Sequence, residues 1–195
     1  ACIGRDRADL VVFGGAILAT HTTFDIRDST FDNNTSNLDG GALACNSCSG
    51  VMENVTVTGG SGGGLFFIGT GHVDLKHMTI VNNFGGSGWD SPSGGSLHVY
   101  GNMTVTLANS VLAENYGLED QEAVNCAVGA NASLISLGNN ALANLTGCNL
   151  TPAGSDVFVE DTGLLPLAAG QDGLPVRELR FDSALIDSFL DASCL

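Results

Sequence analysis

Short apolar runs rich in β-branched residues alternate along the chain with glycine pairs and asparagine-rich turns, and no apolar pattern of helix length occurs. Four segments open on a glycine pair: Gly14-Gly15, Gly40-Gly41, Gly63-Gly64 and Gly94-Gly95. A second apolar run that ends in a polar turn follows each pair: residues 29–34, 55–60, 78–83 and 110–115. From the first glycine to the end of that run the spacing is 20, 20, 20 and 21 residues, which indicates an internal repeat.

A repeat of this size means one supersecondary unit per repeat, and each unit buries its apolar face only against its neighbours. Successive glycine pairs lie 26, 23 and 31 residues apart, which is enough for three short strands and three turns. The sequence therefore predicts an all-β fold, a right-handed parallel β-helix of about five rungs, with neighbouring rungs about 4.8 Å apart. The predicted division is an N-terminal arm (1–13), the rungs (14–150) and an irregular C-terminal tail (151–195) that packs on the coil or extends it.

Within the repeats, alternation separates inward from outward positions. In the first repeat we expect Phe24, Ile26 and Phe31 to point inward and the charged residues at positions 25, 27 and 28 to point outward. Three asparagines recur at one position of the repeat, Asn34, Asn83 and Asn115, and Gly60 stands at that position in the second repeat. These asparagines predict a structural ladder of side-chain amides that bond from rung to rung.

The length indicates one domain, and the net charge limits the classes of possible partner. The chain has 195 residues, which is normally one domain with a sizeable core. Its six Lys and Arg against 21 Asp and Glu give a net charge of −15, which argues against nucleic acid or anionic lipid as a partner. No uninterrupted apolar run approaches about 18 residues, so no membrane span is expected. We expect no cofactor beyond weak Ca2+ binding by the acidic surface.

Six cysteines indicate an oxidising compartment, and spacing suggests some of the pairings without fixing them. Cys126 and Cys148 flank one segment and are expected to close it. Cys45 and Cys48 are also disulfide candidates, with each other or with other partners; a thioredoxin-like strand-to-helix context and further zinc ligands are both missing. Cys2 and Cys194 lie at opposite ends of a coil about 20 Å long. They can bond within one molecule only if a terminus folds back, but they can meet between molecules stacked end to end.

One alternating strand carries candidate chemistry. Residues 71–77 place His72, Asp74 and Lys76 on one face, and a β-helical polysaccharide lyase or hydrolase builds its site on such a face. The same position one rung earlier offers a single acidic residue, Glu53, so a solvated strand face is the alternative interpretation. Three Thr-x-Thr motifs start at different positions of their repeats, which excludes a flat ice-binding ladder.

Glycosylation sequons are frequent and mark exposed loops in a chain secreted by a glycosylating cell. The candidate acceptors are Asn33, Asn34, Asn54, Asn102, Asn131, Asn144 and Asn149.

The glycine-pair repeats resemble those of Pmp-type surface β-helices, and the tail resembles the C-terminal region of secreted bacterial β-helix proteins of the choice-of-anchor Q type. The matching motifs are Ser136-Leu137-Gly138-Asn139-Asn140, Gly147-Cys148, Gly163-Leu164-Leu165-Pro166-Leu167, Gln171-Asp172-Gly173-Leu174-Pro175 and Ser183-Ala184-Leu185-Ile186-Asp187. This resemblance implies an exported β-helix at the cell surface or outside the cell, and it supplies no catalytic residues. The cap that such proteins carry before the first rung is missing from the sequence, so an open N-terminal end is expected.

Two functional hypotheses follow. The first is a non-enzymatic extracellular structural or adhesive protein, with subunits that associate end to end, head to tail, into a surface filament and a possible surface glycan or host cell-surface receptor as partner. The second is a carbohydrate-active β-helix that binds or cleaves a polysaccharide along the face of His72, Asp74 and Lys76. A third possibility is that the chain is the C-terminal piece of a longer surface protein.

Overall fold

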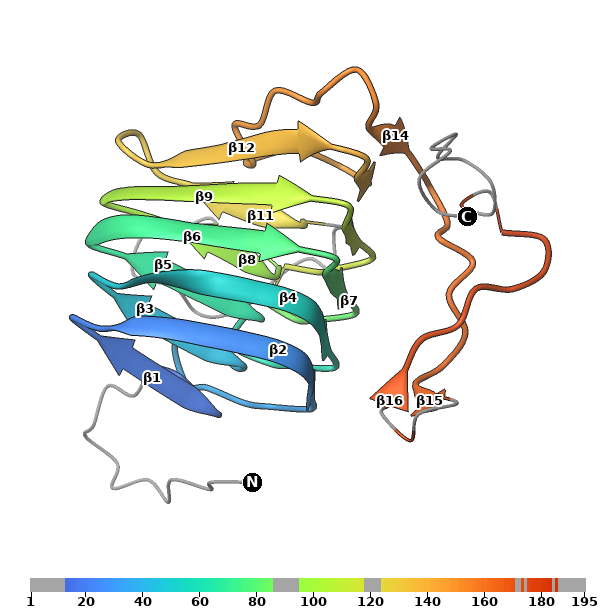
Figure 1. Ribbon diagram of the computed structural model, residues 1–195, viewed down its shortest axis with the longest axis horizontal. Coiled ribbons are helices and arrows are strands. Elements are labelled where there is room, and N and C mark those ends of the chain that lie inside the picture. The colour runs from blue at the N-terminus through green and yellow to red at the C-terminus, as the bar shows by residue number, and fades with distance from the viewer. Residues whose placement is uncertain are drawn as a thin grey trace.

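The computed structural model describes residues 13–85, 95–117, 124–170, 173, 175–183 and 185. Every regular element among these residues is a β-strand, and the long strands lie above one another in parallel layers (Figure 1). The predicted all-β architecture with parallel strands is therefore confirmed. Cys2 and Cys194 lie outside the described residues.

Two parallel sheets carry the fold. Each repeat contributes one strand to the first sheet, and to the second sheet either one long strand or two shorter strands. The first sheet has five strands in the order β1 (Ile17–Thr20), β3 (Leu43–Asn46), β5 (Leu65–Ile68), β8 (Leu97–Val99) and β11 (Cys126–Val128). The second sheet has nine strands: β2 (Thr23–Asp32), β4 (Ser49–Thr58), β6 (Thr70–Lys76), β7 (Thr79–Val81), β9 (Asn102–Ala108), β10 (Val111–Ala113), β12 (Ser133–Gly138), β13 (Ala141–Leu142) and β14 (Val157–Phe158). A separate antiparallel pair joins β15 (Ala168–Ala169) to β16 (Pro175–Val176).

The registers explain why the sequence repeats. Five residues stack in one column of the first sheet, at intervals of 26, 22, 32 and 29 residues: Ile17, Leu43, Leu65, Leu97 and Cys126. Side chains in this column point inward and belong to the hydrophobic core, as do those of Met52, Leu75 and Leu107 in the second sheet. Phe24, Ile26 and Phe31 pack against the same core, as predicted. Each repeat thus buries its apolar side chains against the like side chains of the neighbouring repeats.

The two glycines of a pair have different roles. The first adopts a positive φ, 76° at Gly40 and 83° at Gly62, a conformation that residues with a Cβ rarely take. In the second repeat the other glycine of the pair lies against neighbouring backbone, since a Cβ on Gly41 would sit 2.7 Å from the carbonyl oxygens of Asn34 and Gly63. Because Leu43 pairs with Leu65, the pair of the third repeat is Gly62-Gly63. The prediction of Gly63-Gly64 was wrong by one residue.

The predicted asparagine ladder exists at two of its three positions. The Asn83 backbone N–H donates to Asn115 Oδ1 at 3.0 Å, and Asn83 Oδ1 accepts from the Gly60 N–H at 3.0 Å. The ladder continues into Asn125, whose Oδ1 accepts from both the backbone and the side-chain amide of Asn115. Asn34 occupies the same position of the first repeat, but its neighbour in the next repeat is Gly60. Gly60 has no side-chain amide, so the ladder does not extend to Asn34.

A second ladder, which was not predicted from the sequence, lies at another corner. The Met78 N–H donates to Ser110 Oγ, the Ser110 N–H donates to Asn140 Oδ1, and the Asn140 N–H donates to Asp156 Oδ1, all at 2.9–3.0 Å. Its members are Ser, Asn and Asp, so no single residue type recurs in the sequence. The shared property is a short side chain with an acceptor oxygen that satisfies a buried backbone donor.

Two disulfides are present within one chain. Cys45 and Cys48 are bonded to each other across one corner, with Cα atoms 5.9 Å apart. Cys126 and Cys148 are bonded with Cα atoms 4.8 Å apart, which confirms that they close the segment between them. The structure thus chooses the local pairing that the sequence left open for Cys45 and Cys48.

The tail first extends the second sheet and then returns along its side (Figure 1). Thr162, fully buried, donates to the Glu114 carboxylate, and Ser183 donates to the Thr162 carbonyl oxygen at 2.6 Å. Pro175, near the tip of the β15–β16 hairpin, accepts a hydrogen bond from Thr30 Oγ1 in the first repeat. The tail therefore spans repeats that lie far apart in sequence.

Candidate functional site

The outward face of the long strands forms three side-by-side polar columns. The first column contains Thr23, Ser49, His72, Thr104 and Ser133. The second contains Asp25, Val51, Asp74, Thr106 and Ile135. The third contains Arg27, Glu53, Lys76 and Ala108. We call the surface made by these three columns the polar face.

Asp74 is the centre of the polar face. Its Oδ1 accepts a hydrogen bond from Thr106 Oγ1 at 2.6 Å and lies 2.9 Å from His72 Nε2. Its Oδ2 lies 3.9 Å from Lys76 Nζ. The trio predicted from the alternating sequence is therefore brought together, and the residue added by the structure is Thr106 on the neighbouring strand.

A second charged cluster lies beside the first and toward β2. Arg27 donates from Nε to Asp25 at 2.7 Å and from Nη1 to Glu53. The other Glu53 oxygen lies 4.0 Å from His77 Nδ1. Glu53 pairs with Lys76 in register, as the sequence analysis placed it. Charges of both signs thus alternate across the face.

The hydrogen bond from Thr106 holds the pKa of Asp74 below its ordinary value, with smaller contributions from His72 and Lys76. Partial burial opposes this shift. Asp74 is therefore a carboxylate at neutral pH, where it accepts hydrogen bonds and cannot act as a general acid.

This shift gives a testable expectation. Thr106→Val removes the hydrogen bond that is the largest cause of the lowered pKa of Asp74, and it keeps the shape of the side chain. The pKa of Asp74 should therefore rise in a carboxyl-carbon NMR titration. Lys76→Ala, which removes the weakest contribution, should raise it less. A carboxyl group whose pKa is lowered by folding stabilises the folded state at pH values above its unfolded pKa of about 3.9. The wild type should therefore be more stable than Thr106→Val at neutral pH, and this difference should vanish as the pH falls through the folded-state pKa. An unchanged titration in Thr106→Val would contradict the assignment.

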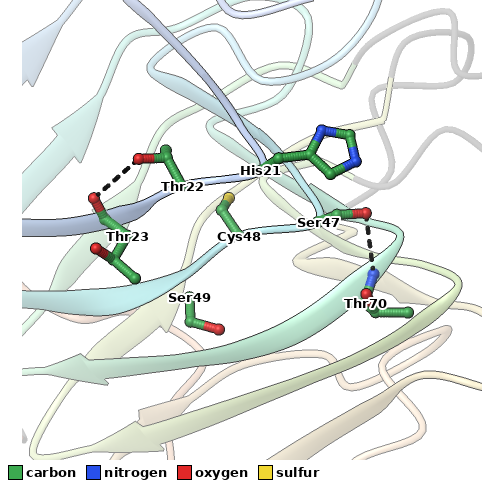
Figure 2. Close-up of a pocket in the computed structure, with 7 residues that line it drawn as sticks. All are labelled: His21, Thr22, Thr23, Ser47, Cys48, Ser49 and Thr70. Carbon is green, nitrogen blue, oxygen red and sulfur yellow. Dashed lines mark hydrogen bonds between the residues drawn. The ribbon is translucent and has the colours of Figure 1, made fainter.

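A shallow groove of about 570 Å³ continues the polar face at the N-terminal ends of β2, β4 and β6. It is lined by His21, Thr22, Thr23, Ser47, Cys48, Ser49 and Thr70, which Figure 2 shows as one group. Hydroxyl groups dominate this lining, and the Cys45–Cys48 disulfide fixes the corner beneath it. Ser49 connects groove and face, since its Oγ accepts from the His72 backbone N–H at 3.1 Å.

Six of the seven sequon asparagines are exposed, and Asn34 is half-buried. Asn102 begins β9 beside Thr70, and Asn131 precedes β12, so both lie next to the polar face. The Asn54 amide donates to Asp28 Oδ1 at 2.7 Å, within an exposed corner where residues 28, 54, 77, 109 and 139 all have positive φ. Whether any of them carries a glycan stays a prediction.

A buried contact between a histidine and a carboxyl group lies on the outer side of the first sheet. His98 Nδ1 is 3.1 Å from Asp39 Oδ1, and the two side chains are only 2% and 1% exposed. Phe66 lies edge-on to His98 and stacks on Phe13 with ring centroids 5.2 Å apart. These residues hold the segment around Asp39 against the sheet and are closed to a ligand.

The column of hydroxyl groups and the cluster around Arg27 were not predicted from the sequence as parts of the site. The sequence contained a signal for them, because polar residues at positions 23, 25 and 27 alternate with apolar ones, as those at positions 72, 74 and 76 do. What was lacking was the register, which sets β2 two strands away from β6.

Over the described part of the chain, no three His, Cys, Asp or Glu side chains gather in a way that could hold a metal ion. In the same residues, no helix has the length and apolar character needed to cross a membrane. Comparison of the chain with protein-family models, with curated proteins and with solved structures finds no match.

Proposed function

We propose that this protein is a non-enzymatic structural or adhesive right-handed parallel β-helix of about five rungs, located outside the cell or on its surface. Parallel strands from every repeat join the same two sheets, which supports the coil. Two intrachain disulfides and the exposed sequons support an oxidising, extracellular location. The resemblance to secreted Pmp-like and choice-of-anchor Q proteins points the same way.

The observation that carries the adhesive role is the polar face with its adjoining groove. Hydroxyl, imidazole, carboxylate, ammonium and guanidinium groups follow one another over five neighbouring strands, a span of about 19 Å. Donors and acceptors spread over such a length fit an extended, hydroxyl-rich polymer. We infer that the partner is a surface glycan.

The charges favour a neutral glycan. Three carboxylates on the face, from Asp25, Glu53 and Asp74, are all paired with the two cations Arg27 and Lys76, which leaves one negative charge in excess. A strongly anionic polymer would meet a chain of net charge −15. Neutral sugar hydroxyls can instead insert between the paired groups and accept or donate hydrogen bonds.

Cleavage of a glycan is the second candidate, because three carboxylates share one face. Glycosidic hydrolysis needs one carboxyl group that is protonated at the working pH, and this requires a raised pKa. The lowered pKa of Asp74 disfavours it in that role. Binding is therefore the function that we propose first.

A glycan array probed with the intact protein tests the proposal. We expect binding to neutral polysaccharides, and we expect the triple variant His72→Ala/Asp74→Ala/Lys76→Ala to lower the affinity at least tenfold, since each lost charge-assisted hydrogen bond is worth about 1.5–3 kcal/mol. Glu160→Ala, at an exposed acidic position on the tail, is the control that should leave binding unchanged.

Two results separate the candidates. Release of new reducing ends from a bound glycan, abolished in the triple variant, would favour the carbohydrate-active alternative. Absence of binding to every glycan, or equal binding by the wild type and the triple variant, would overturn the proposal for this face.

A further inference from the structure

The two ends of the described stack differ. At one end, β2 is a ten-residue strand whose neighbour among the described strands is β4 alone, and it forms the lowest long strand in Figure 1. The core is incomplete there: Ile26 is half-buried, whereas Met52, its partner in the next repeat, has no exposed surface. We call this region, made of β2 with the half-buried Ile17, Phe24, Ile26 and Phe31, the open end.

The other end is covered by the chain itself. Leu145 and Leu150 pack against the core beyond β12, and the inward Leu134 of that strand is 3% exposed. Ser155 Oγ accepts from the Asn139 N–H at 3.1 Å, and Asp156 accepts from Ser136 Oγ at 2.5 Å. Residues 145–156 therefore cover the end of the stack that a head-to-tail contact would use.

The charges on β2 are self-complementary. Asp25 and Arg27 both point outward, on either side of the inward Ile26. If two copies of β2 lie antiparallel about Ile26, Asp25 of each copy faces Arg27 of the other. Two neighbouring registers also keep the inward side of one strand next to the inward side of the other, one centred on Asp25 and one on Arg27. The first sets Asp25 opposite Asp25 of the other copy, and the second sets Arg27 opposite Arg27, so both place like charges against each other.

We propose that the open end is a self-association surface, and that its occupant is a second copy of this chain with β2 paired antiparallel to β2 about a two-fold axis at Ile26. The contact would satisfy the backbone groups of an edge strand and join the two incomplete cores through Ile26. Because each copy uses the same surface, the assembly closes as a dimer. This contact differs from the head-to-tail filament that the sequence predicts. Asp25 and Arg27 also belong to the polar face, so the test below measures association and not glycan binding.

Sedimentation velocity of the full chain over a wide range of concentrations tests this surface. We expect a monomer–dimer equilibrium with no larger species. In a dimer of Asp25→Arg, the new arginine of each copy faces Arg27 of the other. In a dimer of Arg27→Asp, the new aspartate of each copy faces Asp25 of the other, so both variants bring like charges together. Each variant alone should weaken the dimer about tenfold or more.

Mixing the two variants provides the decisive control. In a mixed pair every cross-strand contact again joins opposite charges, so an equimolar mixture should recover dimers that neither variant forms alone. Recovery cannot arise from a folding defect, and unchanged circular dichroism would verify that each variant is folded. Ile135→Asp, an exposed position on β12 at the covered end, should leave the dimer unchanged.

Several outcomes would overturn the proposal. These are a monomer at every concentration, a dimer unaffected by Asp25→Arg, or a mixture that does not recover. Dissociation by Ile135→Asp, or growth of long oligomers, would favour head-to-tail stacking instead. Association that appears only after residues 1–12 are deleted would assign the open end to that segment of the same chain.

Discussion

Replacing Asn83 with alanine is expected to lower the free energy of unfolding by about 3–5 kcal/mol, because it leaves several buried polar groups without partners. The side chain is fully buried, and its amide donates to the carbonyl oxygens of Val57 and Val81 at 3.0–3.1 Å. Its oxygen accepts from the buried Gly60 N–H at 3.0 Å. Equilibrium urea unfolding monitored by far-UV circular dichroism measures the loss.

Asn83→Asp keeps the shape of the side chain and tests the mechanism. It replaces the amide donor with an oxygen that faces Val57 and Val81 carbonyls and places a charge in the core, so it should be at least as destabilising as alanine. Asn109→Gly is the control, since Asn109 is exposed and glycine tolerates its φ of 51°. We expect it to change stability by no more than about 0.5 kcal/mol. Equal losses in Asn83→Ala and Asn109→Gly would contradict the structural role of the buried ladder.

Substitution of Gly41 by alanine is expected to lower stability by about 3 kcal/mol, at the upper end of the usual cost of overpacking. A Cβ at this position would lie 2.7 Å from the carbonyl oxygens of Asn34 and Gly63 and 2.8 Å from that of Ser61. These are backbone atoms held by the hydrogen bonds between repeats, so none of them can turn aside as a flexible side chain would. Thermal and urea unfolding should both report the change.

Gly154→Ala is the matched control for Gly41→Ala. A Cβ at Gly154 would have no atom within 4 Å, so the substitution should be neutral within about 0.5 kcal/mol. A Gly41→Ala variant as stable as Gly154→Ala would mean that neighbouring repeats can move apart at the glycine pair. The close approach of the repeats would then not be the reason for the glycine at this position.

Much of the fold could be predicted from the repeat. Alternation identified Phe24, Ile26 and Phe31 as inward residues and His72, Asp74 and Lys76 as one outward face, because side chains on a strand point to opposite sides in turn. The position of Glu53 beside Lys76 followed from the same reasoning. The disulfide of Cys126 and Cys148 followed from their flanking one segment.

The repeats differ in length, and this limited the rest of the prediction. Intervals of 22 to 32 residues separate equivalent core positions, so a count along the chain misplaced the third glycine pair by one residue. The same irregularity concealed the ladder of Ser110, Asn140 and Asp156, whose members come from three residue types. Asn34 failed as a ladder member because the residue stacked on it is a glycine.

By itself the sequence determined the all-β character, the parallel repeat and the polarity of each strand face, because these depend on periodicity and on glycine conformation, which are local. The tertiary structure decided which strands are neighbours, and so it placed Thr106 against Asp74 and Arg27 between Asp25 and Glu53. It also decided that the tail covers one side of the stack and that the two ends differ. These features depend on contacts between residues far apart in the chain, where loop lengths set the register and no local pattern records it.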